Sequence, residues 1–441
     1  MGSSAIFFLI FLLWSCLRSP AAATVPFNNT FKFVNAGPFA EFSEEYGASS
    51  RELNLFEPPF YMRFYNTTPD AYTLALLIGD HPSEYTTYSV WEANRGKPVG
   101  ENAVFTLGKD GNMFLADVDE RIIWQTNTAD QGVVGCKVLP NGNVVLYDAK
   151  NKFIWQSLDS PTDTLIVGQS LKLGGPAELV SRDSVERNVN GAYSLVLEPS
   201  RLAMYYTSPL DSQRYLYFAS SGLFPVLDPP LKQVTLSSSP KSSKSSDYKI
   251  SLNFQGALKE EKKFILSKPN YNPKTTYLRL TIDGNLRGWI YNVRRFGLAW
   301  AWENKFTLFD RDGGWENECQ LPSKCGEYGL CMDNQCVACP TGNLVAPFLP
   351  WNTSCRPPVL KSCLPKDFVY KKLEGVDHFV SKYTAGEGPL TVEGCAKKCT
   401  DNCNCKGYFY WQGSSRCWVV NELKTLTSVN DTSHMAFIKA P

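Results

Sequence analysis

Histidine is scarce in this sequence: among 441 residues it occurs only as His81, His378 and His434. These three lie far apart, with no nucleophile motif such as G-x-S-x-G nearby, so we expect surface residues rather than catalytic bases or metal ligands. An excess of one charge is also missing, because 44 Lys and Arg residues balance 43 Asp and Glu residues to a net charge of +1. A protein that neutralises a phosphate backbone would be basic, which argues against a nucleic-acid partner.

Paired carboxylates do occur, for example at Glu44-Glu45. A glycosidase, however, needs two carboxylates placed across a cleft. We expect this pair to be solvated charge, and we predict no enzyme activity, no metal and no other cofactor.

Long apolar runs are confined to the N-terminus. Residues 5–13 (AIFFLIFLL) are apolar and three alanines follow at 21–23, which predicts a signal peptide over residues 1–23. No later run reaches about 18 apolar residues, so we expect no membrane span and a secreted protein of the extracellular space or cell wall. Four sequons agree with export and predict glycosylation at Asn28, Asn66, Asn352 and Asn430.

An internal repeat dominates the first part of the chain. The tripeptide DGN at 110–112 begins fourteen residues before Trp124, and NGN at 141–143 begins fourteen residues before Trp155. Trp91 precedes both. Alternating apolar residues around DG and NG are typical of β-hairpins, and one Trp per repeat predicts a shared aromatic core.

Residues 166–314 show the same theme more faintly. The segments YSLVLEPSRLAMYYTS (193–208) and TYLRLTIDGNLRGWIYN (276–292) both have a hairpin pattern. Between them, the Ser/Lys run SSSPKSSKSSD from Ser237 to Asp247 predicts an exposed loop.

Cysteine is concentrated near the C-terminus. Six cysteines in a short, weakly apolar segment indicate a disulfide scaffold whose pairing we leave open: Cys319, Cys325, Cys331, Cys336, Cys339 and Cys355. In the last block, Cys395 and Cys399 are four residues apart and would share one face of a helix that Thr391 can cap.

These motifs resemble a known family along almost the whole mature chain. VWEANRGKPV (90–99) and WQSLDSPTDTL (155–165) are similar to signatures of the S-domain found in plant S-locus glycoproteins and S-domain receptor kinases. Because the chain shows no kinase segment, it resembles the epidermis-specific secreted glycoproteins within this family.

The resemblance implies a mainly β protein with tandem bulb-lectin β-prism domains, an EGF-like module and a PAN/apple α+β domain. The implied boundaries are a signal peptide at 1–23, a bulb-type lectin domain at 24–165, a second lectin-like domain at 166–314, the EGF-like module at 315–357 and the PAN/apple domain at 358–441. In the last domain the family pattern implies the disulfides Cys399–Cys405 and Cys395–Cys417, which leaves Cys363–Cys403.

Bulb lectins bind mannose through the motif Q-x-D-x-N-x-V-x-Y. Carried over to this chain, the best copy keeps Asn143, Val145 and Tyr147, with Asn141 in place of the Asp and Leu139 in place of the Gln. Every second residue of a strand lies on one face, so these side chains would act together.

The first-repeat copy of this motif keeps only Asp110 and Asn112. We therefore expect any residual sugar binding on the 143–147 strand, where Tyr147→Phe and Asn143→Ala should weaken it without lowering the thermal midpoint. The alternative is that DGN and NGN persist only as hairpin turns.

Cys136 is left over after the two cysteine-rich blocks and Cys16 of the signal peptide are set aside. It is either a buried thiol beside Val133 and Val134 or a thiol that forms a disulfide with a partner chain.

Two functions follow from the sequence. The first is a non-catalytic, secreted glycoprotein that binds mannose-containing glycans or high-mannose glycoproteins. The second is a protein-recognition module that binds a secreted glycoprotein or a receptor ectodomain, with the lectin domain as scaffold.

Overall fold

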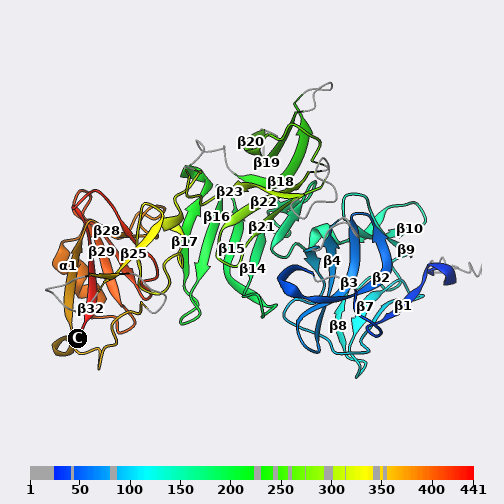
Figure 1. Cartoon of the computed structure of the whole chain (residues 1–441), viewed down its shortest axis with the longest axis horizontal. Coiled ribbons are helices and arrows are strands. Elements are labelled where there is room, and N and C mark those ends of the chain that lie inside the picture. Colours follow the sequence, from blue (N-terminus) through cyan, green and yellow to red (C-terminus); the bar gives the residue numbers. More distant parts are fainter. Residues whose placement is uncertain are drawn as a thin grey trace, which may run out of the picture.

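The hairpins of the first part of the chain form three antiparallel sheets around one axis (Figure 1). The computed structural model describes residues 24–40, 44–79, 87–222, 230–241, 247–256, 261–273, 275–292, 301–312, 314–340, 348–350 and 355–441. The expected signal peptide, the sequon residue Asn352 and His81 lie outside these residues.

We call the first three-sheet body the first prism. Its sheets have the strand orders β1-β6-β7-β8, β2-β3-β4-β5 and β11-β10-β9. The strands are β1 (Phe31–Val34), β2 (Ser49–Glu57), β3 (Phe60–Thr68), β4 (Ala71–Ile78), β5 (Tyr88–Glu92), β6 (Val104–Leu107), β7 (Met113–Ala116), β8 (Ile122–Gln125), β9 (Val133–Val138), β10 (Val144–Asp148) and β11 (Phe153–Gln156). Three short 3-10 helices accompany them: η1 (Phe27–Asn29), η2 (Glu45–Gly47) and η3 (Ser157–Asp159).

One tryptophan from each sheet lies near the axis of this prism. The ring centroids of Trp91, Trp124 and Trp155 are 5.7 to 5.9 Å apart, and each pair meets edge to face. Edge-to-face contact is a favourable geometry for aromatic rings. The structure therefore confirms the shared aromatic core that the spacing of the repeats predicted.

The second prism repeats the architecture with the strand orders β12-β21-β22-β23, β13-β18-β19-β20 and β14-β15-β16-β17. Its elements are β12 (Thr164–Ile166), β13 (Ser170–Lys172), β14 (Glu178–Arg182), β15 (Asn190–Glu198), β16 (Arg201–Thr207), β17 (Arg214–Ala219), η4 (Ser220–Gly222), β18 (Leu231–Pro240), β19 (Tyr248–Gly256), β20 (Glu261–Ser267), β21 (Thr276–Leu280), β22 (Leu286–Tyr291) and β23 (Trp302–Thr307). Strand β12 pairs with β21, so the boundary expected at 165/166 falls inside a strand of the second prism.

The Ser/Lys run begins as a strand, and its residues 242–246 lie outside the described part of the chain. Strand β18 extends through Ser237 to Pro240, where it pairs with β19 up to Tyr248. Backbone pairing does not require an apolar side chain, so serines extend the ladder beyond the core. The expectation of a loop from Ser237 onward was wrong for these first four residues.

The C-terminal part joins the two cysteine-rich blocks in one sheet, of order β26-β25-β24-β31-β28, and adds a second sheet, of order β27-β32-β29-β30. Its elements are η6 (Glu318–Gln320), β24 (Leu330–Met332), β25 (Gln335–Pro340), β26 (Phe348–Pro350), η7 (Pro365–Asp367), β27 (Val369–Glu374), β28 (Val376–His378), α1 (Val392–Thr400), β29 (Gly407–Trp411), β30 (Arg416–Val420), β31 (Leu426–Ser428) and β32 (His434–Ala440). The EGF-like strand β24 pairs in parallel with β31 of the PAN block, so the two modules are one structural unit.

Helix α1 begins as expected, because the Thr391 hydroxyl accepts a hydrogen bond from the Gly394 amide at 3.1 Å. Its cysteines Cys395 and Cys399 are both buried. The disulfides of the structure are Cys319–Cys331, Cys325–Cys336, Cys339–Cys355, Cys363–Cys403, Cys395–Cys417 and Cys399–Cys405.

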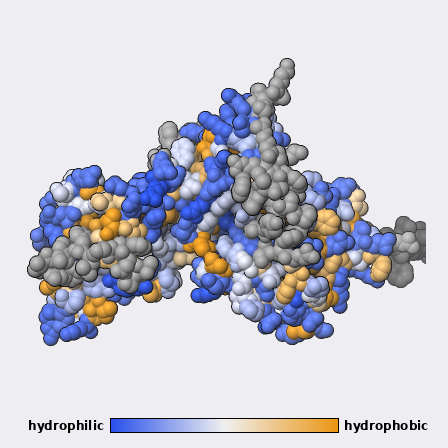
Figure 2. Space-filling view, viewed as in Figure 1, coloured by the Kyte–Doolittle hydropathy of each residue, from blue (hydrophilic) through white to orange (hydrophobic). Residues whose placement is uncertain are grey.

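The whole molecule is elongated, with the first prism at one end, the second in the middle and the PAN block at the other (Figure 1). The hydrophobic core of the second prism continues into the C-terminal part, so these bodies are firmly packed together. On the face in Figure 2, apolar side chains form small patches among hydrophilic surface. Among the described residues, no helix has the length and apolar character needed to cross a bilayer.

Candidate carbohydrate-binding faces

The DGN and NGN tripeptides are first of all turns. In both, the side-chain oxygen of the first residue accepts a hydrogen bond from the backbone N–H of the third residue. The Asn112 N–H donates to Asp110 at 3.1 Å, and the Asn143 N–H donates to Asn141 at 3.2 Å. The central Gly142 has a φ of 82°, a left-handed conformation that favours glycine. The lectin-like tripeptides are therefore explained by backbone geometry before any ligand is considered.

The third residue of each tripeptide is held by a side-chain hydrogen bond to a nearby strand. Asn112 donates to Gln125, and Asn143 donates to Gln156, each over 2.9 Å. Asn143 is only 3% exposed. Its amide oxygen faces the Ser157 hydroxyl and the backbone N–H of residue 158, each at 3.4 Å. The Asn143 amide thus has protein partners where a sugar hydroxyl was expected.

Val145 and Tyr147 lie on the same outward face of β10 but differ in access. Val145 has no exposed surface, because Lys137 on β9 and Gln156 on β11 flank it directly across the sheet. Tyr147 stays partly exposed and lies over Gly135, where an added Cβ would be 2.7 Å from the phenol oxygen. Of these two motif residues, Tyr147 is the one that a ligand can reach.

We call the outer surface of the sheet β9–β11 the hairpin face and define it by Lys137, Asn141, Tyr147, Gln156 and Asp159. The Lys137 ammonium lies 4.5 Å from the centre of the Tyr147 ring, and the Gln156 amide donates to the exposed Asp159 carboxylate at 2.7 Å. Hydroxyl, amide and carboxylate groups thus converge on one shallow surface.

The motif comparison missed Lys137, Gln156 and Asp159. A signal for Gln156 was present, since Gln follows Trp in both repeats, at 124–125 and 155–156. The other two could not be found from the motif, because they come from a neighbouring strand and from η3.

The outer face of β6–β8 keeps fewer polar groups. Asp110 is exposed and Asn112 is partly exposed, but Phe114 and the buried Ala116 stand where the motif has Val and Tyr. This face therefore lacks the phenol that the hairpin face presents.

The third face of the first prism is covered by the second prism. Its strand register pairs Leu76 with Trp91, as the other sheets pair Leu115 with Trp124 and Leu146 with Trp155. By this equivalence, Thr73 and Glu92 occupy the places of the Asn and Gln in the other two sheets.

Both of these residues bond to the second prism rather than facing solvent. Asn188 donates to the Thr73 hydroxyl at 2.9 Å and to the Glu92 carboxylate at 3.3 Å. The buried Tyr65 hydroxyl also donates to Glu92. On this face, Asn188 of the second prism therefore takes the hydrogen bonds that a ligand would need from Thr73 and Glu92.

The family signature residues form the joint between the prisms. Arg95 of VWEANR contacts Glu92 at 2.5 Å and Asp163 of the DSPTDT segment at 2.8 Å. Burial alone would raise the pKa of Asp163, but the charges of Arg95 and Arg279 outweigh it and hold the pKa below its usual range. Arg279 also donates to the Thr164 hydroxyl at 2.9 Å. The signature residues Arg95, Asp163 and Thr164 therefore serve the packing of the two prisms against each other.

The acidic pair Glu44-Glu45 belongs to the same packing, so the expectation of solvated charge was wrong. Glu44 is buried against Arg63 and Ser50, and Glu45 forms an ion pair with Arg279. Burial raises the pKa of Glu45, even with Arg279 beside it.

Of the two described histidines, His378 is buried, against expectation, and His434 is partly exposed. His378 is buried, its Nε2 lies 3.0 Å from the Leu423 carbonyl, and burial lowers its pKa to about 3. His434 is partly buried and its Nδ1 lies 2.8 Å from Asp377. Sequence patterns did not reveal the packing between the two C-terminal sheets, which buries His378 completely and His434 only in part.

Cys136 lies on β9 opposite Leu146, with its sulfur 3.9 Å from the Met113 sulfur. The side chain packs partly buried against the core of the first prism. Burial raises the pKa of its thiol to about 12, which disfavours the reactive thiolate. This environment fits the buried-thiol alternative.

Three of the four predicted glycosylation residues are in the described part of the chain. Asn28 and Asn430 are exposed, and Asn66 on β3 is partly exposed. Glycosylation at these residues remains a prediction.

Comparisons with known proteins place these features in a family. A model described as D-mannose binding lectin matches residues 87–180, and a PAN-like domain model matches residues 369–424. A monomeric mannose-binding lectin from Gastrodia elata is similar in structure at 21% identity, with a TM-score of 0.18, over 29% of this chain and 96% of the lectin chain.

Two curated relatives match much more of the chain. EP1-like glycoprotein 4 of Arabidopsis thaliana is 44% identical over 98% of this chain and 96% of its own length. The epidermis-specific secreted glycoprotein EP1 of Daucus carota is 46% identical over 80% of this chain and 92% of its own length. The chain therefore belongs to the family of EP1-like, epidermis-specific secreted glycoproteins of plants.

Proposed function

We propose that the chain is a non-catalytic glycoprotein of the plant cell wall or apoplast that binds mannose-containing glycans through the hairpin face. The observation that carries the proposal is the partly exposed Tyr147, which lies above Gly135 with Lys137 against its ring, on the same sheet as the Gln156–Asp159 pair opposite Val145. These groups offer hydrogen-bond donors and acceptors that suit sugar hydroxyls.

The site differs from the complete lectin motif in which residues remain available. Asn143 and Val145 support the surface from below, while Asn141, Tyr147 and Asp159 are accessible to a ligand. The Asp159 carboxylate is also bonded to Gln156 and, at 3.3 Å, to Lys172. A shallow site with few partners binds a single sugar weakly, so branched high-mannose glycans, which can present several sugars to one surface, should bind better than monosaccharides.

A glycan array tests this proposal with protein secreted from a plant host. Tyr147→Phe removes one hydroxyl and should weaken high-mannose binding about two- to tenfold, the factor expected for one lost hydrogen bond. Gly135→Ala should also weaken it by displacing the Tyr147 ring. Tyr61→Phe, a partly exposed tyrosine of another sheet, is the matched control and should bind as the parent does. Equal binding by all of these proteins would contradict the proposal.

A protein-recognition role is the second candidate. The burial of Asn143 and Val145 favours it, because these residues then serve the scaffold rather than a sugar. An array with no bound glycan, together with capture of a secreted glycoprotein or receptor ectodomain, would support this role instead.

A further inference from the structure

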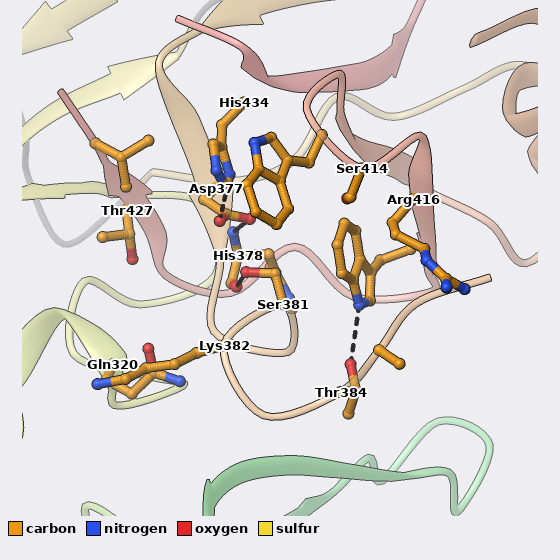
Figure 3. A pocket seen from close by; sticks show the side chains of 14 residues that line it. Gln320, Asp377, His378, Ser381, Lys382, Thr384, Ser414, Arg416, Thr427 and His434 are labelled. Atoms are coloured by element: carbon orange, nitrogen blue, oxygen red, sulfur yellow. Dashed lines mark hydrogen bonds and ion pairs between the residues drawn. The ribbon is translucent and has the colours of Figure 1, made fainter. Parts of the chain in front are cut away.

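A cavity of about 550 Å³ lies in the C-terminal part, at the junction of the EGF-like and PAN blocks (Figure 3). Its wall includes Gln320 from η6 as well as residues of β28, β29, β30 and β32. Its size is that of an ordinary small-ligand site, and the function proposed above does not involve this cavity.

Three side chains form a row across the sheet at this cavity. Trp411 on β29 is the register partner of Arg416 on β30 and of His434 on β32, so all three lie on the same face. Trp411 is 37% exposed and its ring stacks on His434 at 5.0 Å between centroids. An indole that is held in place and still accessible offers a flat apolar platform.

Polar groups around the platform are partly fixed and partly unused. Asp377 accepts from the His434 ring at 2.8 Å and from the backbone N–H of residue 378 at 2.7 Å, which orients the imidazole. Ser414 is one of the lining residues, and its hydroxyl oxygen is buried without a hydrogen-bond partner among the described residues. A buried hydroxyl in this state gains from a ligand that bonds to it.

One positive charge at the cavity has no carboxylate partner in the described part of the chain. Lys382 is neutralised by the buried Glu316, and Asp377 is paired with His434. Among the residues that the structure describes, Arg416 donates only to the Gly388 carbonyl, at 2.9 Å, which leaves most of its N–H groups available to a ligand. A planar guanidinium with free donors is well suited to a carboxylate.

We propose that this cavity binds a uronic-acid residue of an acidic polysaccharide. The apolar face of the pyranose ring rests on Trp411, the carboxylate pairs with Arg416, and ring hydroxyls bond to Ser414 and to the free Nε2 of His434. This Nε2 lies 3.8 Å from Asp431, beyond hydrogen-bond distance, and is therefore available.

The fold disfavours a peptide that would add as a strand. Strand β30 is the edge of its sheet, but the backbone of Glu387 already bridges to Cys417 on that edge. Because the edge is occupied, the ligand must be recognised by side chains rather than by backbone hydrogen bonds. This mode of recognition suits a sugar ring better than an extended peptide.

Calorimetry on the full secreted chain tests the proposal with three probes. These are a galacturonic-acid oligosaccharide, the same oligosaccharide with methyl-esterified carboxyl groups, and a peptide with a free C-terminal carboxylate. The parent should bind the acidic sugar at least about tenfold more tightly than the ester, the factor expected for one charge-assisted hydrogen bond. Arg416→Gln should abolish that preference, and Trp411→Leu should weaken both sugars.

Arg121→Gln, which removes an exposed arginine of the first prism, is the matched control and should bind as the parent does. Tyr147→Phe should also leave this binding unchanged, which separates it from the hairpin face. Thermal midpoints identify any variant that fails to fold, and Trp411→Leu then provides an independent test of the same site. Equal binding of acid and ester, unchanged binding by both cavity variants, or binding of the peptide alone would overturn the proposal.

Discussion

Asn141 and Asn143 stand two residues apart in one turn, yet the fold gives them different roles. Asn141 is exposed, whereas Asn143 is buried and bonded to Gln156. A motif comparison weighs them equally, because it sees residue type and spacing but not which amide already has a protein partner. The expectation that Asn143→Ala spares the thermal midpoint therefore lacks support from the structure.

We predict instead that Asn143→Ala lowers the free energy of unfolding by about 1–3 kcal/mol, since it leaves Gln156 and Ser157 without their partner. Tyr147→Phe should leave the midpoint unchanged, because the structure gives the phenol no hydrogen bond among the described residues. Thermal unfolding of the two variants beside the parent provides the comparison. A midpoint for Asn143→Ala equal to that of the parent would show that the buried amide contributes nothing.

Cys136 yields a second prediction at the residue scale. Since burial raises the pKa of its thiol to about 12, alkylation of the folded protein near pH 8 should be much slower than that of the denaturant-unfolded protein. Non-reducing electrophoresis should show a monomer. A higher-mass species that disappears in Cys136→Ser would establish a covalent partner and refute this prediction.

Among the elements, helix α1 illustrates how local patterns become fixed by long-range bonds. Thr391 and the four-residue spacing of Cys395 and Cys399 were sufficient to predict the helix, its cap and its buried face. Its attachment depends on the disulfides of Cys395 with Cys417 on β30 and of Cys399 with Cys405, just before β29.

Replacing both Cys395 and Cys417 by Ala should lower the free energy of unfolding by about 2–5 kcal/mol, the usual cost of losing a bridge from a small secreted domain. Lys397→Ala on the exposed side of the same helix is the control and should change little. Peptide mapping of the unreduced protein should recover all six pairs of the structure. A different partner for Cys395 would contradict the assignment.

At the scale of the whole molecule, the two prisms are held by charges that come from distant segments. Arg95 and Asp163 are 68 residues apart in sequence, and Arg279 and Glu45 are 234 apart. Breaking a buried pair from one side leaves an uncompensated charge, so the joint should be sensitive to single substitutions.

We predict that Asp163→Asn destabilises the protein by about 3 kcal/mol near neutral pH. The pKa of Asp163 is lower in the folded chain than its ordinary value of 3.8, so its contribution is full above that pH and is lost as the pH falls through the folded value. Denaturant unfolding from pH 7 downward should therefore show the parent and the variant converging in acid. A constant difference between the two curves would contradict the role assigned to the ionised carboxylate.

Much of this architecture follows from the sequence because it depends on neighbours along the chain. Residues close together in the sequence determine the Asx turns around Gly111 and Gly142, the alternation along strands and the helix cap at Thr391. The equal offset of Trp124 and Trp155 from the two turns reveals the repeat. These local patterns were enough to predict β-hairpins and the shared aromatic core, and the resemblance of residues 90–99 and 155–165 to known signatures indicated the family.

Burial and pairing were decided only by tertiary structure, because they depend on which distant residues meet. The sequence could not show that Glu44 and His378 are buried, or that the second prism covers the face of Thr73 and Glu92. Nor could it show that the amide of Asn143 is already hydrogen-bonded within the protein. The cavity beside Trp411 arises in the same way, since it takes its wall from two cysteine-rich blocks that meet where β24 pairs with β31. Local geometry determined which elements form, and the energetic need to pair every buried polar group determined which residues remain free for a ligand.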